Sequence, residues 1–240
     1  MNTTHTQSLP KQHTLNQPAL QIASGTQFGH WGGLFWNRRP LVLVEACETI
    51  SLHSGLHLVV APNGAGKTTL MRTLAGLHPA LSGRSEIRGK VHYVSDQLQF
   101  DGELSAHDFF RAWFCGSARS FAENLGGTLG LNIKTPIRQL SLGNRQKMLL
   151  CVAETLAAHS GPSLLLLDEP LAGMDAQTRE KVGELWAASA ASVLRLVVLH
   201  ELESIQKADS LFTVVGGRLR HARERIGGSW LKTCQLLRAA

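Results

Sequence analysis

The sequence has few cysteines, and they form neither a metal-binding nor a disulfide pattern. The four of them are spread along the 240-residue chain, with no pair in Cys-x-x-Cys spacing: Cys47, Cys115, Cys151 and Cys234. A structural zinc site and a disulfide framework are therefore not expected, and the pattern favours a reducing compartment.

Long hydrophobic runs are also missing. No stretch approaches the roughly 18 consecutive apolar residues that a membrane-spanning helix needs. Residues 1–18 are polar and lack the apolar core of a signal peptide. We predict a flexible tail over residues 1–18 and one domain over residues 19–240. Because we expect this domain not to cross a membrane, a role at a membrane would require docking onto another protein or onto the surface.

The composition is that of a folded domain with a basic surface. Hydrophobic residues make up 43% of the chain and charged residues 18%, which argues against a disordered chain. The net charge is +6, from 24 lysines and arginines against 18 acidic residues. This excess suits nucleotides, nucleic acid or an anionic membrane surface, and a generally basic soluble surface explains it equally well.

Short apolar runs alternate with stretches of helical periodicity, which predicts parallel strands joined by helical crossovers. The runs expected to form buried strands are Leu56–Val60, Val91–Val94, Leu164–Leu167, Leu194–Leu199 and Leu211–Val215. The stretches expected to form helices are Thr68–Leu77, Arg145–His159 and Ala176–Ser189. Residues 105–140 break this rhythm, and we expect them to form a small helical lobe whose aromatic residues pack on one another.

Residues 61–69 read APNGAGKTT and predict a phosphate-binding loop. They match Gly-x-x-x-x-Gly-Lys-[Ser/Thr] except that Ala61 replaces the first glycine, and they lie between a predicted strand and a predicted helix, as the motif requires. The residues expected to bind the nucleotide phosphates are Asn63, Gly64, Ala65, Gly66, Lys67, Thr68 and Thr69. Their main-chain N–H groups can wrap a phosphate at the positive end of the following helix.

Two side chains of this loop have specific predicted roles. Lys67 is expected to reach the β- and γ-phosphates, and the Thr68 hydroxyl is expected to bind Mg²⁺. A capped glycine-rich turn would explain Gly64 and Gly66, but it would not explain Lys67. If the position of Ala61 requires a positive φ, its methyl group costs on the order of 1 kcal/mol.

Two carboxylates follow the predicted strand in LLLLDEP, residues 164–170. The carboxyl edge of a parallel sheet is where ligands bind. Asp168 can hold Mg²⁺ through water, and Glu169 can polarise the water that attacks the γ-phosphate. The alternative is an acidic turn after a core strand, and the upstream phosphate loop favours the functional reading.

The order of the motifs resembles that of ABC-type (ATP-binding cassette) ATPases over roughly residues 30 to 220. The phosphate loop is followed by Gln97, LSLGNRQK at 140–147, LLLLDEP, AGMD at 172–175 and His200. The resemblance implies an α/β fold: a P-loop NTPase core with a parallel sheet, an N-terminal antiparallel β layer and an inserted helical subdomain at about residues 98–160.

The resemblance also implies a dimer. LSLGNRQK looks like the family signature, which contacts the γ-phosphate of ATP bound to the opposite subunit through Ser141 and Gly143. Leu142 stands where glycine is usual and Asn144 where glutamine is common, which is closer to exporter-type cassettes. Ser141 is also expected to cap the following helix, and this does not exclude the signature role.

Further roles come from the same resemblance. Asp175 matches the loop that communicates between the two sites, and His200 matches the switch histidine that senses the γ-phosphate. Gln97 matches the glutamine that links the nucleotide and its metal to the membrane partner, although Asp96 is an alternative for that position.

Adenine is expected to stack on an aromatic residue upstream of the phosphate loop. Trp36 is the first candidate, Phe35 and Trp31 are alternatives, and simple packing is possible for all three.

The sequence therefore predicts an ATP-binding and ATP-hydrolysing subunit of an ABC transporter that uses ATP and Mg²⁺. Its expected partners are an integral membrane transporter subunit and a second ABC ATPase subunit, identical or different, with no nucleic acid. It is expected on the cytoplasmic face of the membrane as a peripheral protein. The alternatives are a soluble ABC-type ATPase acting on nucleic acid or ribosomes and a degenerate, nucleotide-sensing cassette.

Overall fold

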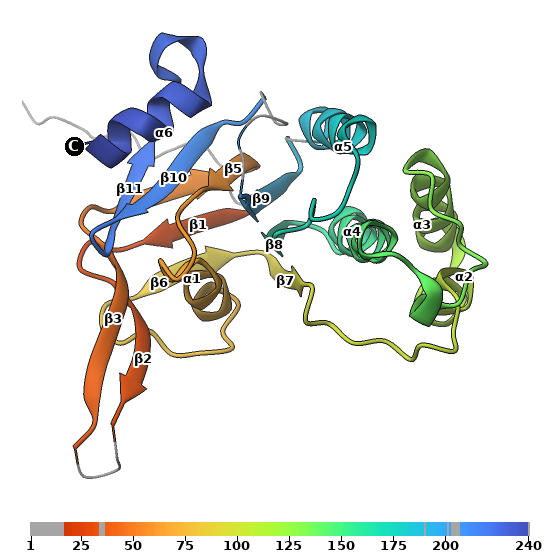
Figure 1. Ribbon diagram of the computed structural model, residues 1–240, viewed down its shortest axis with the longest axis horizontal. Helices are drawn as coiled ribbons and strands as arrows, with labels where there is room; N and C mark the ends of the chain where they lie inside the picture. The colour runs from red at the N-terminus through yellow and green to blue at the C-terminus, as the bar shows by residue number, and fades with distance from the viewer. Residues whose placement is uncertain (1–16, 34–36, 190, 201, 203–206, 240) are drawn as a thin grey trace, which may run out of the picture.

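The computed structural model describes residues 17–33, 37–189, 191–200, 202 and 207–239. Two sheets form the left part of the molecule in Figure 1, and a group of helices forms the right part. The large sheet contains, in spatial order, β2 (Gln27–Gly32), β3 (Arg39–Ala46), β11 (Arg218–Ala222), β10 (Ser210–Val215), β5 (Gly55–Val59), β9 (Val193–Val198), β8 (Ser163–Asp168) and β7 (Lys90–Ser95). The small sheet contains β4 (Ile50–His53), β1 (Ala19–Ile22) and β6 (Ser85–Arg88).

The helices lie against these sheets and in the lobe beside them (Figure 1). They are α1 (Lys67–Leu74), α2 (Ala106–Trp113), α3 (Gly116–Thr128), α4 (Leu142–His159), α5 (Ala176–Ala188) and α6 (Trp230–Ala239), with short 3-10 helices η2 (Ile137–Gln139) and η3 (Ile226–Gly228). Residues 1–16 of the predicted tail lie outside the described residues, and the domain bounds 19–240 and 98–160 stay predictions.

The strand directions agree with the predicted α/β class. Strands β10, β5, β9, β8 and β7 are parallel neighbours, whereas β2 and β3 pair antiparallel at one end of the large sheet. The small sheet is antiparallel throughout. The N-terminal antiparallel strands are thus divided between the two sheets, and β6, which follows α1, completes the small one.

The large sheet separates two hydrophobic cores because successive side chains of a strand point to opposite faces. In β8, Leu165 and Leu167 pack with the lobe, α4 and α5, whereas Leu164 and Leu166 pack with α1 and the small sheet. All six residues of this strand are buried. This burial explains why the strand reads as a continuous run of leucines.

Helix α1 is shorter than the sequence predicts. It ends at Leu74 rather than Leu77 because Gly76 adopts a left-handed conformation, with φ of 75°. The amide of Leu77 donates to the carbonyl of Arg72 at 2.9 Å, and the amide of Gly76 donates to that of Thr73 at 3.0 Å. This is the Schellman arrangement, which ends a helix at a glycine.

The lobe contains α2 and α3 on the right of Figure 1, where α3 packs against α4 and α2 packs against α3. Ser105 and Asp108 form a capping box at the start of α2, which fixes where the helix begins. The ring of Phe109 contacts those of Phe100 and Trp113, with centroids 4.9 Å apart in both pairs. The aromatic cluster therefore packs the lobe, as the sequence analysis predicts.

Candidate active site

Four neighbouring strands bring the predicted site residues to one edge of the large sheet. Their last positions lie opposite one another in the register: Ser95 of β7, Asp168 of β8, Val198 of β9 and Val59 of β5. The chain then continues into Asp96, Glu169, His200 and the phosphate loop respectively. Segments far apart in the sequence thus meet at the carboxyl edge, where parallel sheets bind ligands.

The phosphate loop has the conformation that the motif requires. Gly64 and Gly66 have φ values of 77° and 88°, which residues with a Cβ rarely adopt. A Cβ on Gly66 would also lie 2.8 Å from Leu43 of β3. Ala61 is not among the described residues with positive φ, so its methyl group causes no backbone strain there.

The start of α1 is open to an anion. Gly66 precedes the helix and no side chain caps it, so the first N–H groups are left for another acceptor. The Lys67 side chain is buried, and its Nζ donates to the carbonyls of Ala61 at 2.8 Å and Pro62 at 3.1 Å. A phosphate offers this ammonium a charged acceptor in place of neutral ones, and such hydrogen bonds are roughly twice as strong.

Asp168 has the surroundings of a cation ligand. Burial raises the pKa of its carboxyl group, and the charges of Glu169 and Asp96 raise that pKa further. The Thr68 hydroxyl hydrogen-bonds to it and opposes this shift, and the Tyr93 hydroxyl lies 3.4 Å from Oδ2. Clustered oxygen donors with excess negative charge fit Mg²⁺, which prefers carboxylate, hydroxyl and phosphate oxygens.

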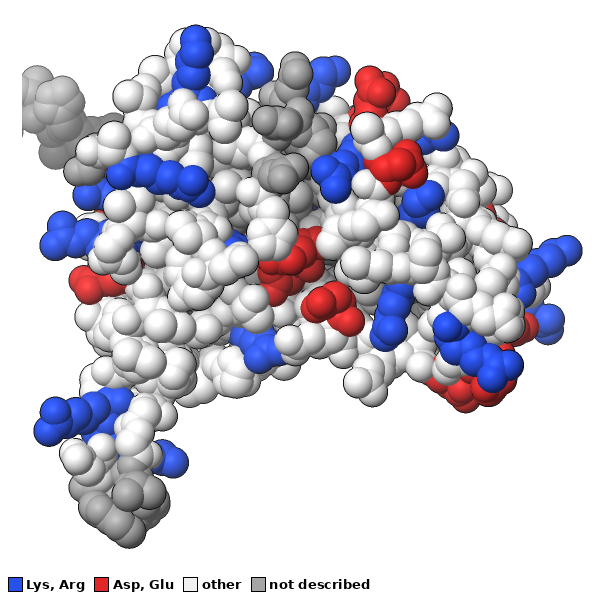
Figure 2. Space-filling model, in the orientation of Figure 1, with Lys and Arg blue, Asp and Glu red and all other residues white. Residues whose placement is uncertain are grey.

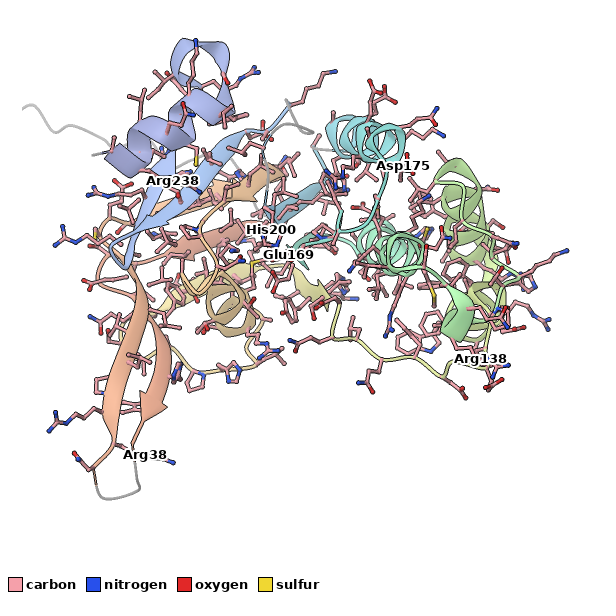
Figure 3. The ribbon with its side chains drawn as sticks, in the orientation of Figure 1. Arg38, Arg138, Glu169, Asp175, His200 and Arg238 are labelled. Atoms are coloured by element: carbon pink, nitrogen blue, oxygen red, sulfur yellow. The ribbon has the colours of Figure 1, made fainter. Side chains whose placement is uncertain are left out.

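Glu169 is the one described residue other than glycine with a positive φ, at 56°. This conformation costs roughly 1–2 kcal/mol for a residue with a side chain, and such strain clusters at functional sites. Its Oε2 lies 2.8 Å from Nε2 of His200, and both side chains are partly exposed, at 36% and 49%. Figure 3 shows Glu169 and His200 next to each other near the centre of the molecule, and Figure 2 shows acidic side chains on the surface in the same area.

The two alternatives for the glutamine position face different groups. The amide oxygen of Gln97 accepts a hydrogen bond from the guanidinium of Arg72 on α1. The negative charge of Asp96 raises the pKa of the Asp168 carboxyl group. The role of Gln97 at the metal and the nucleotide stays a prediction. Of the two alternatives, Asp96 is the one whose charge affects the Asp168 carboxyl group.

The predicted signature and the loop before α5 lie against each other. A Cβ on Gly143 would lie 2.2 Å from the carbonyl oxygen of Gly173, so only glycine fits there. Ser141 is exposed and caps α4 by accepting from the amide of Asn144 at 3.3 Å. The first turn of α4 is thus fixed against the AGMD segment.

Asp175 caps α5. Its side chain accepts from the amide and the hydroxyl of Thr178, both at 2.8 Å. Its carboxylate also lies 3.9 Å from Nζ of Lys147 on α4, a contact that sequence reasoning missed. The hydrogen bonds from Thr178 lower the pKa of Asp175, and Lys147 adds to this shift.

The aromatic candidates for adenine are only partly placed. Trp36 and Phe35 lie outside the described residues. Trp31 lies on β2 and is 52% exposed. Sequence reasoning also missed Tyr93 and Arg72, because a strand tyrosine and a helix arginine carry no motif of their own.

Comparisons with known proteins decide the family. A family model described as ABC transporter matches residues 50–172. The chain belongs to the ABC transporter family. A cytochrome c biogenesis ATP-binding export protein CcmA from Novosphingobium aromaticivorans is 37% identical over 161 residues, which is 65% of this chain and 79% of that protein. The protein of the same name from Mesorhizobium japonicum is 35% identical over 182 residues, or 69% of this chain and 89% of that protein.

Solved structures show the same fold. A bacterial Atm1-family ABC exporter with ATP bound matches with a TM-score of 0.70 and 18% identity, covering 93% of this chain and 40% of that chain. A dimeric ATP-binding cassette in a post-hydrolysis state, bound to ADP and Pi, matches with a TM-score of 0.67 and 18% identity, covering 86% of this chain and 99% of that chain.

These findings confirm the predicted fold class and the predicted function. This ABC cassette is an ATP-binding, ATP-hydrolysing transporter subunit. They support neither a nucleic-acid-directed ATPase nor a degenerate sensor.

Proposed function

We propose that ATP–Mg²⁺ binds at the carboxyl edge of β5, β9, β8 and β7, and that Glu169 and His200 support hydrolysis there. What supports this most directly is the register that places the phosphate loop, Asp168, Glu169 and His200 at the ends of neighbouring strands. Lys67 and the open start of α1 bind the phosphates. Thr68 and Asp168 hold Mg²⁺, which neutralises phosphate charge when bound.

In the proposed chemistry, Glu169 orients and polarises the water that attacks the γ-phosphate. Its carboxylate lies 2.8 Å from Nε2 of His200, and its main chain has a positive φ of 56°. When ATP binds, His200 can turn toward the γ-phosphate and leave the carboxylate for water. The partial exposure of both side chains is compatible with this exchange of partners.

A second ABC subunit, of the same or another chain, completes each site. Ser141 and Leu142 are exposed at the start of α4, at 56% for Leu142, which leaves this helix end available to a nucleotide on a partner. Helix N-termini bind phosphate through their free N–H groups. Two chains arranged head to tail would therefore enclose two ATP molecules between their phosphate loops and signatures.

The transport step requires a membrane protein. In the part of the chain that the structure describes, no helix is long and apolar enough to span a membrane. Large apolar side chains are exposed at Trp113 in the lobe and at Leu98 and Leu104 in the segment leading into it, at 65%, 40% and 38%. We assign this surface to contact with an integral membrane subunit, with the chain on the cytoplasmic face of the membrane.

Glu169→Gln tests the catalytic assignment. The variant should bind ATP–Mg²⁺ with unchanged affinity because the phosphate loop is intact. Its turnover, measured as phosphate release in the complex with the membrane subunit, should fall by about 10²–10⁴-fold, the contribution of a positioned base. Turnover at the unsubstituted rate would overturn the assignment of Glu169.

A further inference from the structure

One carboxylate outside the site joins three elements of the fold. Glu154 lies in α4 and is 3% exposed, and its partner Arg195 lies in β9 and is 1% exposed. The guanidinium donates through Nε to Oε1 at 3.0 Å and through an Nη to Oε2 at 2.6 Å. The indole N–H of Trp186 in α5 donates to Oε1 at 2.8 Å. Glu154 thus accepts three hydrogen bonds from two other elements.

Arg195 extends the network to the end of α5. Its guanidinium donates to the hydroxyl of Ser189 at 2.8 Å and lies 3.4 Å from the carbonyl oxygen of the same residue. Ser189 is the residue that ends α5. We call Glu154, Arg195, Trp186 and Ser189 the polar hub.

Each element that meets in the polar hub also carries a residue of the site. Helix α4 begins after Ser141, and α5 begins after Asp175. Strand β9 leads into His200. The hub therefore links the signature, the loop between the sites and the switch histidine through the interior, on the lobe side of the large sheet.

Burying a charged pair such as Glu154 and Arg195 carries a large free-energy cost of desolvation. Removing two charges from water carries a desolvation penalty that the ion pair often only offsets, and apolar side chains of similar size commonly pack as stably. What a bidentate guanidinium–carboxylate pair adds is a fixed distance and direction between its two elements. Helix α4 and strand β9 also contribute apolar side chains to the same hydrophobic core, including Leu150, Ala153 and Val197.

We propose that the polar hub positions Ser141, Asp175 and His200 relative to one another. When the chain closes on the ATP at its own phosphate loop, its signature is then oriented to contact the ATP bound by the partner subunit. Glu154 and Arg195 are positioning residues that act through the elements they join. This inference rests on the proposed function. The competing explanation is that the hub only contributes stability.

The test replaces both charges with apolar side chains of similar length, Glu154→Met with Arg195→Met, in the full chain carrying Glu169→Gln. Dimerisation with ATP–Mg²⁺ is measured by sedimentation, ATP binding to the monomer by titration, and stability by thermal unfolding. We expect unchanged ATP binding and a folded protein, with ATP-driven dimerisation weakened on the order of tenfold or more, because small misplacements of binding groups are costly. A matched control, Arg84→Met with Glu86→Met, removes an ion pair whose side chains are 78% and 61% exposed, and should dimerise like the parent.

Dimerisation equal to that of the parent, in the folded double variant, would overturn the hub's positioning role. If the double variant does not fold, Arg195→Lys decides instead: it keeps the charge but loses the bidentate contact, and it should still weaken dimerisation relative to ATP binding. Parent-like dimerisation by that variant would equally overturn the inference.

A second readout separates this inference from the proposed function. Hydrogen exchange of the monomer should increase at residues 141–146 in the double variant and not in the control, because α4 loses its fixed direction. Failure of the Glu169→Gln parent to dimerise with ATP would count against the proposed function, whereas unchanged exchange at residues 141–146 would count against the hub.

Discussion

Two carboxylates of this chain each contact a basic side chain, and the two pairs differ in their exposure to solvent. Glu169 and His200 meet at the open edge of the sheet at 2.8 Å, with side chains 36% and 49% exposed. Glu154 and Arg195 meet inside the molecule at 2.6 Å, with side chains 4% and 1% exposed. Water can replace either partner of the first pair, and neither partner of the second.

The difference indicates two uses of the same chemistry. An exposed pair contributes about 0–1 kcal/mol, so exchanging its partners costs little during a reaction cycle. A buried pair is strongly destabilised when one partner is lost, so it keeps its geometry throughout the cycle. We therefore expect the contacts that change during the cycle to lie at the edge of the sheet, and the fixed ones to lie in the interior.

The largest expected effect on stability is that of Glu154→Ala. This change leaves the Arg195 charge buried without its carboxylate, and we expect the free energy of unfolding to fall by about 3–5 kcal/mol. Urea denaturation measures it. A loss below about 1 kcal/mol would remove the contrast between the two pairs.

Gly143→Ala comes next. The added methyl group would lie 2.2 Å from the carbonyl oxygen of Gly173, so the start of α4 must shift away from the AGMD segment. We expect a loss of about 1–3 kcal/mol, typical of overpacking, and weaker ATP-driven dimerisation. Leu142→Ala is the matched control, because this neighbour is 56% exposed and its truncation should leave stability nearly unchanged. Equal stability of the two variants would contradict the close approach of these glycines.

A smaller effect depends on pH. Burial lowers the pKa of His221 from 6.5 to about 4, and the charge of Arg223 contributes to this shift. Between these two values the unfolded chain binds a proton that the folded chain does not, so the free energy of unfolding falls as the pH drops through that window. Partial exposure limits the effect to roughly 1 kcal/mol. His221→Phe keeps the stack on Phe212 and should flatten stability over this window, and an unchanged pH profile would contradict the assignment to His221.

The smallest effect on stability is expected for His200→Gln. Its contact with Glu169 is exposed, so the free energy of unfolding should change by less than about 1 kcal/mol. Turnover should nevertheless fall, because in the proposed function His200 is the side chain that responds to the γ-phosphate. Chemical denaturation measures the stability and phosphate release measures the turnover of the same preparation. A loss of stability as large as that of Glu154→Ala would contradict the difference between the exposed pair and the buried pair.

The edge was more predictable from the sequence than the interior. Lys67, Asp168 and His200 belong to motifs whose spacing follows strand, loop and helix, so their convergence follows from a parallel sheet. No sequence motif predicts the polar hub. Glu154 lies within a helical pattern and Arg195 within an apolar run, 41 positions apart. Their contact depends on how α4 packs on β9, which local periodicity does not encode. The predicted end of α1 at Leu77 is wrong for a local reason, because Gly76 adopts a left-handed conformation that ends the helix.

The central claim is that the phosphate loop and Lys67 bind the triphosphate of ATP. Titration of the full chain with ATP–Mg²⁺, before and after Lys67→Ala, tests it most directly, with Lys90→Ala on β7 as an exposed lysine control. Because a charge-assisted hydrogen bond is worth about 1.5–3 kcal/mol, Lys67→Ala should weaken binding by roughly 10–150-fold, and Lys90→Ala should not. Equal affinity of all three proteins for ATP would contradict the account.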